Sequence, residues 1–488
     1  MVKMPRASMS VLSQNEKAKV HDASVRILTE VGVKVDSSTV LKMLGKAGAK
    51  ILEDKQIARI TEDMVSDAIK SATRSVKICS RGGMDHIIPS EGTQLVSPDG
   101  QPPALIDVET GKRRPSTLED AIKMAILADA LPEVDFVWPP IVATDMPSDR
   151  SSYYEFLATI AYTSKHVQHG AGSEKEARFQ IEVASAILGS EEGLRRRPIF
   201  SDVITPISPL RYDGGEAEAM VALAKAGVPV VQLSMGIASA VTPVTISGTL
   251  AVANAENLCG LTITQVTNAG SPSIYSSFSG VADLRTGVFV CGTPEGILMD
   301  VAATEMAKHY RLPSCAGGPA TAARSIGAEG GYQSAMTAMA SVLVGADMMV
   351  GLGGLDRDGV FSPEKLIMDC EAWRWIERLR MGIEIDDARL AVDAVKRQGP
   401  GGTFLSDPHT LQFMRKELMI PQVTGFHVPG EPDRSRDEMR EYSRKKVREI
   451  LSSHKPPLLE KATALRVQEV AKRWGILLED GAHIFAHA

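Results

Sequence analysis

Aromatic, histidine and charged side chains recur in this sequence where short β-rich segments end. Trp138 lies in the first such segment, His169 ends the second and Gln232 lies in the fourth. In a barrel of parallel strands, catalytic and binding groups lie where strands end and loops begin. Polar side chains in such positions must be hydrogen-bonded or contact a ligand. These positions form a candidate small-molecule site that comprises Trp138, His169, Asp202, Gln232, Tyr275, Phe278, Asp283, Arg285, Arg324, Glu329, Asp356, Arg357, Asp358 and His409.

The spacing of the histidines and cysteines gives little support to metal binding or thiol catalysis. His166 and His169 are three residues apart on a predicted strand, so their side chains point to opposite faces and are poor joint zinc ligands. We expect no bound metal. The cysteines are far apart, with no CxxC pair, and we interpret them as the reduced thiols of a cytoplasmic protein. They are Cys79, Cys259, Cys291, Cys315 and Cys370.

Several candidates also have a purely structural explanation. Tyr275 and Phe278 are as consistent with core packing as with ligand binding, and Asp283 and Arg285 are as consistent with an ion pair that braces a loop. The segment DPHTLQ (407–412) resembles the DxHxxG motif through which some proteins hold cobalamin, but the glycine is absent. We therefore expect no corrinoid bound in the chain itself.

The elements that position these residues repeat as strand, turn and helix from Asp135 onward. Eight such units favour closure into a (β/α)8 TIM barrel of the α/β class. An open doubly wound sheet is the alternative, but its GxGxxG fingerprint is missing after the first strand. The predicted strands are 136–142, 166–170, 199–205, 228–235, 273–279, 312–317, 348–352 and, more weakly, 402–405.

Three segments of the chain differ in pattern. Residues 1–132 alternate helices with a hairpin predicted within 92–115, and we expect them to pack on the barrel as an N-terminal layer. Ser13 and Glu16 form a capping box at the start of the first helix. The catalytic barrel is predicted at 133–425. A charged helical extension at 426–488 is expected to pack on the barrel or on a neighbouring subunit of a homo-oligomer.

The composition excludes several classes of partner. Of the 488 residues, 44% are hydrophobic and 23% charged, and the formal net charge is −6. Nucleic acids and anionic membranes select basic surfaces, so neither is an expected partner. The first residues contain no apolar signal region, and no window offers about 18 uninterrupted apolar residues. We expect a cytoplasmic protein that acts on small molecules.

Seven segments, in order along the chain, resemble the trimethylamine:corrinoid methyltransferase family over roughly residues 15–425. They are SPLRYDG (208–214), AGVPVV (226–231), DLRTGVF (283–289), GTPEG (292–296), AGGPAT (316–321), GPGGTFL (399–405) and PHTLQFMRKE (408–417). The resemblance implies a TIM barrel that takes a methyl group from a methylated amine. It also implies that the acceptor is Co(I) of a corrinoid held by a separate protein.

The sequence departs from that family at one informative place. Trimethylamine enzymes of the family carry pyrrolysine near the end of the sixth strand, whereas this chain has only standard residues. Where many relatives have TDSK followed by a PDAQ-like run, this chain has TAAR (321–324) and then GAE (327–329). The resemblance therefore implies a quaternary amine rather than trimethylamine. Glycine betaine is the first expectation, and proline betaine, carnitine or a choline-like amine is the alternative.

The chemistry of methyl transfer supports a quaternary amine independently. A quaternary ammonium is already activated, because its leaving group is a neutral tertiary amine. The enzyme must hold the cation, align one methyl group and exclude water. Each aromatic face contributes about 0.5 to 2 kcal/mol to cation binding. Because the positive charge is lost in the transition state, very tight cation binding would oppose the reaction.

Aromatic residues and arginines near the strand ends are the predicted ligands of such a substrate. An arginine can hold a betaine carboxylate through two hydrogen bonds, and Arg211 and Arg324 are the candidates. The predicted substrate-binding residues are Trp138, Tyr153, Tyr154, His169, Arg211, Gln232, Tyr275, Phe278 and Arg324.

Two further residues are the predicted catalytic groups. Glu329 would face the ammonium, which favours a substrate without a carboxylate, and His409 would anchor the substrate or the corrinoid. Two other functions remain open. One is a lyase or aldolase that forms a Schiff base on Lys165, the only lysine near a strand end. The other is a non-catalytic protein that binds methylated amines.

Overall fold

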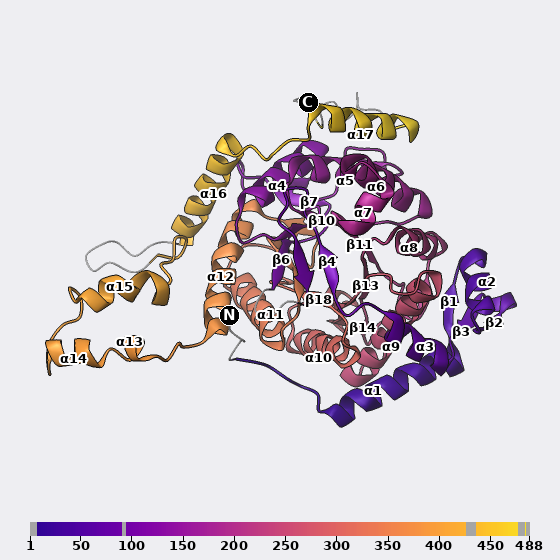
Figure 1. The fold of residues 1–488 in the computed structure, drawn as a ribbon, viewed down its shortest axis with the longest axis horizontal. Coiled ribbons are helices and arrows are strands. Elements are labelled where there is room, and N and C mark those ends of the chain that lie inside the picture. Colours follow the sequence, from indigo (N-terminus) through magenta and orange to yellow (C-terminus); the bar gives the residue numbers. More distant parts are fainter. Residues whose placement is uncertain (1–6, 90–93, 426–435, 477–483, 485–488) are drawn as a thin grey trace.

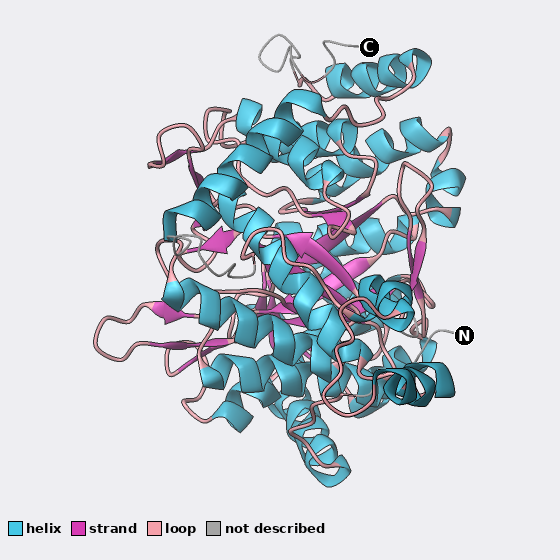
Figure 2. Cartoon of the chain, turned by 90° about the vertical axis from the view of Figure 1, so that its left-hand side faces the viewer, coloured by secondary structure: helices cyan, strands magenta, loops and turns pink. Residues whose placement is uncertain are grey.

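The centre of the molecule is a sheet of eight parallel strands, surrounded by helices (Figures 1 and 2). The computed structural model describes residues 7–89, 94–425, 436–476 and 484. In the order in which they pair, the strands are β6 (Leu95–Pro98), β19 (Met348–Leu352), β18 (Ser314–Gly317), β15 (Ser273–Ser277), β13 (Val230–Ser234), β11 (Phe200–Ile204), β10 (His166–Gly170) and β9 (Phe136–Val137).

The two ends of this order meet and close the sheet. The backbone N–H of Asp135 donates to the carbonyl oxygen of Val96 at 2.9 Å, and the backbone N–H of Val96 donates to the Asp135 carboxylate at 2.9 Å. The predicted (β/α)8 TIM barrel is therefore confirmed.

The strand predicted at 402–405 is wrong, because these residues contain no strand and all are exposed. Strands of a parallel barrel are buried on both faces, which this segment cannot achieve. Its place is taken by β6, which pairs with β19 and comes from the N-terminal part of the chain. The hairpin expected within 92–115 is correspondingly smaller, since only β7 (Ala104–Ile106) and β8 (Arg113–Pro115) pair in antiparallel fashion.

The strand predicted at 136–142 is also shorter than expected. Only Phe136 and Val137 pair with β10. Trp138 is followed by Pro139 and Pro140, which lack the backbone N–H that a central strand needs. The chain therefore leaves the barrel at Trp138.

Within the described residues, nine helices form the outer ring of the barrel. They are α4 (Leu118–Ala130), α5 (Ser151–Tyr162), α6 (Glu174–Leu188), α7 (Glu191–Arg196), α8 (Gly214–Ala226), α9 (Ile246–Thr267), α10 (Pro294–Tyr310), α11 (Ala328–Val344) and α12 (Pro363–Met381). The helices have ordinary caps: Ser173 accepts a hydrogen bond at the start of α6, and Gly189 adopts a left-handed conformation at its end. The main hydrophobic core lies between this ring and the sheet.

A hairpin closes the end of the barrel where the strands begin. It consists of β4 (Val76–Ile78) and β5 (His86–Ile88), which pair in antiparallel fashion. Val76, Ile78 and Ile88 share one hydrophobic cluster with barrel side chains such as Phe136 and Met348. Just after β4, the backbone N–H of Cys79 donates to the carbonyl of Pro198, which precedes β11. The barrel interior is therefore filled at this end, and its mouth lies at the carboxyl ends of the strands.

The N-terminal layer packs on the outside of α9. It contains α1 (Gln14–Arg26), a π-helical turn (Ile27–Val31), β1 (Val33–Val35), α2 (Ser38–Lys46), β2 (Lys50–Leu52), a 3-10 turn (Glu53–Lys55), β3 (Ile57–Arg59) and α3 (Glu62–Ser71). The predicted capping box of Ser13 and Glu16 is present. β1, β2 and β3 form a small sheet with β12 (Arg211–Tyr212).

Further short strands lie in the loops around the mouth. They are β14 (Ile237–Ala238), β16 (Gly280–Ala282), β17 (Phe289–Val290), β20 (Gly354–Leu355) and β21 (Val360–Phe361). Pairing of β16 with β17, and of β20 with β21, holds the loops after β15 and β19 in place.

After α12 the chain leaves the barrel and later returns to it. The helices α13 (Asp387–Leu390), α14 (Val392–Gln398) and α15 (Pro408–Glu417) form an arm that projects to the lower left in Figure 1. α16 (Arg436–Ser453) packs on α12, and α17 (Lys461–Arg473) packs on α6. No helix in the described part of the chain is long and apolar enough to cross a membrane.

Candidate functional site

A cavity of about 330 Å³ opens at the carboxyl ends of the barrel strands. Every barrel strand contributes a lining residue, either from the strand itself or from the residues that directly follow it. This volume lies at the small end of the range for small-molecule sites.

Three aromatic rings line the cavity and are here together termed the aromatic wall. They belong to Trp138, Phe278 and Phe289. The rings of Phe278 and Phe289 pack edge to face, with centroids 6.2 Å apart. Two glycines make room for these rings because they have no side chain. A Cβ atom at Gly100 would lie 2.3 Å from the Trp138 ring, and one at Gly317 would lie 2.7 Å from the Phe278 ring.

Two carboxyl groups, Asp99 and Asp358, line the same cavity. Burial raises the pKa of Asp99 well above its usual range, and the charge of the neighbouring Asp358 carboxyl raises it further. Burial also raises the pKa of Asp358 to about 6, although its hydrogen bond with Asp99 and the charge of Lys365 act in the opposite direction. The two groups titrate as a pair. Because burial raises the pKa of both groups and two neighbouring carboxylates repel each other, the pair shares one proton near pH 7 and carries one negative charge.

An arginine lies beside this carboxyl pair. Arg357 lines the cavity, and its guanidinium donates to Asp356 at 2.6 Å. Asp356 also accepts from Arg113 at 2.9 Å, which fixes the loop to β8. Asp356, Arg357 and Asp358 have φ angles of 52°, 60° and 64°. Three successive non-glycine residues in the left-handed region are costly, and such backbone strain is concentrated at functional sites.

The floor of the cavity contains an unpaired amide. Gln168 is fully buried, and neither its Oε1 nor its Nε2 has a hydrogen-bond partner within the part of the chain that the structure describes. Most buried polar groups are paired, so an unpaired amide facing a cavity is available to a ligand or to water.

Four of the positions singled out from the sequence meet in this cavity, namely Trp138, Phe278, Arg357 and Asp358. Three others lie on the outer faces of their strands. The Tyr275 hydroxyl donates to Asn254 at 2.9 Å, Gln232 contacts the sulfur of Met220, and His169 packs on Phe156. Burial lowers the pKa of His169 to about 4. Because side chains alternate along a strand, these three residues face the helices and not the cavity.

The predicted tyrosines and arginines also lie outside the cavity. Tyr153 packs edge to face on Phe179, with centroids 4.8 Å apart, and Tyr154 is buried between helices. Arg211 pairs with Asp36 at 2.7 Å on the small N-terminal sheet. Arg324 is 79% exposed at the rim, 3.8 Å from Asp356.

The two predicted catalytic residues lie outside the cavity lining, Glu329 exposed and His409 half-buried. Glu329 lies in the first turn of α11, on the rim side of the barrel. His409 lies on α15 in the arm, where its Nε2 contacts the carbonyl of Ala388 at 3.0 Å and its ring packs on Phe413.

The remaining predicted chemistry has structural explanations. Asp283 and Arg285 form an exposed ion pair at 2.9 Å in the turn between β16 and β17. Lys165 is buried before β10, at the closed end of the barrel, and donates to the carbonyls of Ala128 and Leu131. All five cysteines are free and buried. Among the residues that can be described, no group of three or more His, Cys, Asp or Glu is placed to hold a metal.

The cavity residues that were not predicted from the sequence include Asp99, Gln168 and Phe289. Gln168 lies between His166 and His169 in HVQHG, where the alternation of faces would have revealed it once the inner face was known. Asp99 follows β6, a strand that the sequence pattern assigned to a hairpin. Phe289 is held over the cavity by the β16–β17 pairing.

Known proteins resemble the chain over nearly its full length. The family model for trimethylamine methyltransferase (MTTB) matches residues 1–475. The trimethylamine methyltransferase MttB of Desulfitobacterium hafniense (strain DSM 10664 / DCB-2) is 28% identical over 95% of this chain and 94% of its own. The glycine betaine methyltransferase of Desulfitobacterium hafniense (strain Y51) is 27% identical over 94% of this chain and 96% of its own.

A solved structure has the same overall fold. The monomethylamine methyltransferase MtmB of Methanosarcina barkeri superposes with a TM-score of 0.52 and 13% identity, covering 96% of this chain and 89% of its own. At this identity the likeness concerns the fold alone. The family model, in contrast, extends over both the barrel and the cavity residues. The chain therefore belongs to the trimethylamine methyltransferase (MTTB) family of methyltransferases.

Proposed function

We propose that the protein transfers a methyl group from a quaternary amine, with glycine betaine as the first candidate, to Co(I) of a corrinoid on a separate protein. The observation that carries this proposal is the cavity, in which an aromatic wall, a singly charged carboxyl pair and an arginine come together. One relative, which is 27% identical to this chain, is named a glycine betaine methyltransferase.

The aromatic wall and the carboxyl pair suit a trimethylammonium group. The faces of Trp138, Phe278 and Phe289 supply cation–π attraction of about 0.5 to 2 kcal/mol each. The Asp99–Asp358 pair adds one negative charge without donating to the cation. A quaternary ammonium has no N–H, so it needs no hydrogen-bond acceptor from the pair.

Arg357 gives the cavity a preference for a zwitterion. Its guanidinium suits a carboxylate, which it can bind through two hydrogen bonds, and Asp356 fixes its position. The unpaired amide of Gln168 offers a further donor inside the cavity. A substrate with a carboxylate near a trimethylammonium group fits both charges, whereas a choline-like amine leaves the arginine unused.

The methyl acceptor must approach from outside the barrel. A cavity of about 330 Å³ has room for a small amine but not for a corrin ring in addition. When bound at the mouth, Co(I) supplies the electron pair for the new bond to the methyl carbon while the carbon–nitrogen bond breaks. The role of this chain is to orient one methyl group outward and to exclude water from the cation. The tertiary amine leaves with both electrons of the broken bond, so it is neutral.

The rim of the mouth offers a docking surface for the corrinoid protein. Exposed apolar side chains stand on the loops after β11, β13 and β15 and on the first turns of α11. They are Ile207, Val244, Leu284, Val288, Tyr332 and Met336. An apolar patch with polar neighbours is typical of a protein contact.

A panel of methylated amines tests the proposal. The purified protein is mixed with chemically reduced cobalamin and with glycine betaine, proline betaine, carnitine, choline or trimethylamine, and methylcobalamin is followed by absorbance. We expect methylation of cobalt with a carboxylated quaternary amine and none with trimethylamine. Binding of betaine without any turnover would instead indicate a non-catalytic binding protein. A Schiff-base enzyme is not supported, because Lys165 lies at the closed end of the barrel.

A further inference from the structure

Asp356 lies at the meeting point of three arginines at the rim of the cavity. Its Oδ1 accepts from Nη2 of Arg357 at 2.6 Å, and its Oδ2 accepts from Nη1 of Arg113 at 2.9 Å. Nε of Arg324 is 3.8 Å from Oδ1. Burial opposes the ionisation of Asp356, but the hydrogen bonds from Arg357 and Arg113 outweigh burial and lower its pKa. One buried carboxylate is therefore shared by three cations.

The three arginines come from separate parts of the chain. Arg113 lies on β8, Arg324 follows β18, and Arg357 belongs to the turn between β20 and β21. The strands β7 and β8 join β20 and β21 in one four-stranded sheet, through parallel pairing of β21 with β7. The N-terminal hairpin β7–β8 is therefore part of the frame that holds the turn with Asp356 and Arg357.

The segment after β18 is attached to the same turn. The backbone N–H of Asp356 donates to the carbonyl of Ala323 at 2.8 Å, and the backbone N–H of Arg357 donates to the carbonyl of Thr321 at 3.1 Å. Residues 356–358 have left-handed φ angles. Such a strained backbone persists only when the surrounding structure determines it. The direction of the Arg357 side chain therefore depends on the neighbours of the turn.

Arg357 keeps donors for a ligand although Asp356 holds it. A guanidinium carries five N–H donors. Among the residues that the structure describes, Asp356 is the only acceptor of the Arg357 guanidinium, and it uses Nη2. The N–H groups of Nε and Nη1 remain for a carboxylate in the cavity that Arg357 lines. Asp356 can therefore fix the direction of Arg357 without using all of its donors.

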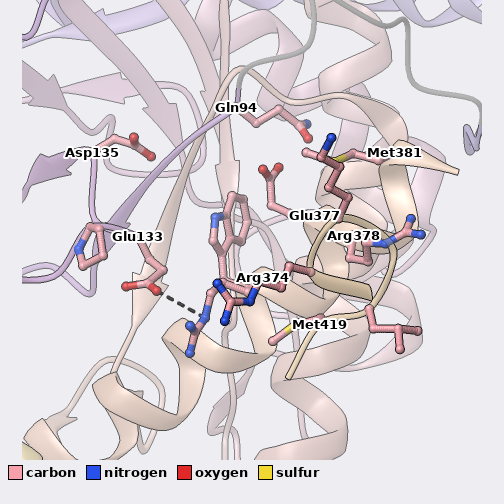
Figure 3. A pocket seen from close by; sticks show the side chains of 13 residues that line it. Gln94, Glu133, Asp135, Arg374, Glu377, Arg378, Met381 and Met419 are labelled. Carbon is pink, nitrogen blue, oxygen red and sulfur yellow. Dashed lines mark ion pairs between the residues drawn. The ribbon is translucent and has the colours of Figure 1, made fainter. Parts of the chain in front are cut away.

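Arginines at the opposite end of the barrel have a different use. A groove of about 460 Å³ lies there, where the chain enters β6 and β9 (Figure 3). In this groove Arg374 pairs with Glu133 at 3.2 Å, and Arg378 pairs with Glu417 at 3.5 Å, so both ion pairs join α12 to distant segments. The pair of Asp356 and Arg357, in contrast, links adjacent residues and joins no segments. Its effect is to direct the arginine side chain.

We propose that Arg113 is a positioning residue for the substrate carboxylate: it holds Asp356, which in turn directs Arg357 into the cavity. The inference rests on the proposed function, because it assumes a substrate that carries a carboxylate. It assigns part of the substrate specificity to the hairpin β7–β8, although none of the described residues of this hairpin lines the cavity. Since the role is indirect, loss of Arg113 should weaken carboxylate binding less than loss of Arg357.

Calorimetric titration of the full-length protein with three ligands tests this role. Glycine betaine carries both charges, 3,3-dimethylbutanoate carries the carboxylate alone, and choline carries the ammonium alone. We expect Arg113→Ala to weaken binding of both carboxylates about three- to tenfold, as is typical of residues in one ion-pair network, and to leave choline binding unchanged. Arg113→Lys should restore part of the loss. Because the Arg113 side chain is 48% exposed, the circular dichroism spectrum should not change.

Two controls separate an indirect role from other effects. Lys112→Ala removes the same charge from the neighbouring exposed position and should leave all three affinities unchanged. A double-mutant cycle then tests whether Arg113 acts through Arg357. In the Arg357→Ala background, Arg113→Ala should have no further effect on betaine binding.

The inference is overturned if Arg113→Ala leaves binding of both carboxylates unchanged, if it weakens choline binding equally, or if its effect persists in the Arg357→Ala background. It is also overturned if the wild type binds neither carboxylate. Betaine binding that depends on Arg113, without any methyl transfer to Co(I), would support this inference while refuting the proposed reaction.

Discussion

Replacement of Trp138 by alanine tests the aromatic wall directly. Trp138 is one of three rings that face the cavity, and its backbone N–H is fixed by a hydrogen bond to Ser97 at 3.0 Å. Its loss removes about 0.5 to 2 kcal/mol of cation–π attraction, which weakens binding about 2- to 30-fold. Because the ammonium loses its charge in the transition state, the loss should raise KM more than it lowers kcat.

The assay compares a zwitterion with a carboxylate of the same shape that lacks the ammonium charge. Binding of glycine betaine and of 3,3-dimethylbutanoate, in which carbon replaces nitrogen, is measured by calorimetry for the wild type, Trp138→Ala and Trp138→Phe. We expect Trp138→Ala to weaken betaine binding far more than binding of the carbon analogue, and Trp138→Phe to restore most of the difference.

A second tryptophan provides the control. Trp375 is 46% exposed at the opposite end of the barrel, and Trp375→Ala should leave betaine affinity unchanged. If Trp138→Ala weakened binding of the carbon analogue as much as binding of betaine, the ring would act through shape alone, and the cation–π assignment would be wrong.

Three further predictions concern the other cavity residues. Betaine affinity should fall as the pH drops below about 6, because the Asp358 carboxylate then takes up a proton and the carboxyl pair becomes neutral. The Asp358→Asn variant should bind betaine more weakly at pH 7 and should lose this pH dependence. Calorimetric titrations on both sides of pH 6 measure both effects. Arg357→Ala should raise the KM for betaine by at least tenfold, since a charge-assisted contact of about 1.5 to 3 kcal/mol is lost, yet change choline binding little. Gly100→Ala should displace the Trp138 ring, because the new Cβ would lie 2.3 Å from it, and thermal unfolding should show a loss of about 1 to 3 kcal/mol in stability together with weaker betaine binding.

The strand–helix rhythm was sufficient to predict the barrel but not its closing strand. β6 is four residues long and is bordered by turn residues, so its local pattern equally fits half of a hairpin. What makes it a barrel strand is its pairing with β19, about 250 residues later, and contact with β9. No local signal in the sequence encodes a pairing over that distance.

The candidate cavity lies at the end of the barrel where the sequence placed the site, but several of the predicted residues face away from it. Alternation shows which residues of a strand share a face. It does not show which face is inside, because strands of a parallel barrel are buried on both. Tyr275 and Gln232 were therefore assigned to the cavity although they face the helices, while Gln168 was overlooked. Arg357 and Asp358 were located at a strand end. Their approach to the cavity depends on backbone φ angles in the left-handed region, which these residue types do not predict.

Methyl transfer from labelled glycine betaine is the most direct test of the proposed reaction. The protein is incubated with betaine carrying 13C-methyl groups and with cob(I)alamin, or with its corrinoid protein in the reduced state, and both products are quantified. We predict equal amounts of methylated corrinoid and dimethylglycine, formed only when Co(I) is present. Failure to methylate the corrinoid from betaine or from any other quaternary amine, with a correctly folded enzyme, would contradict the proposal.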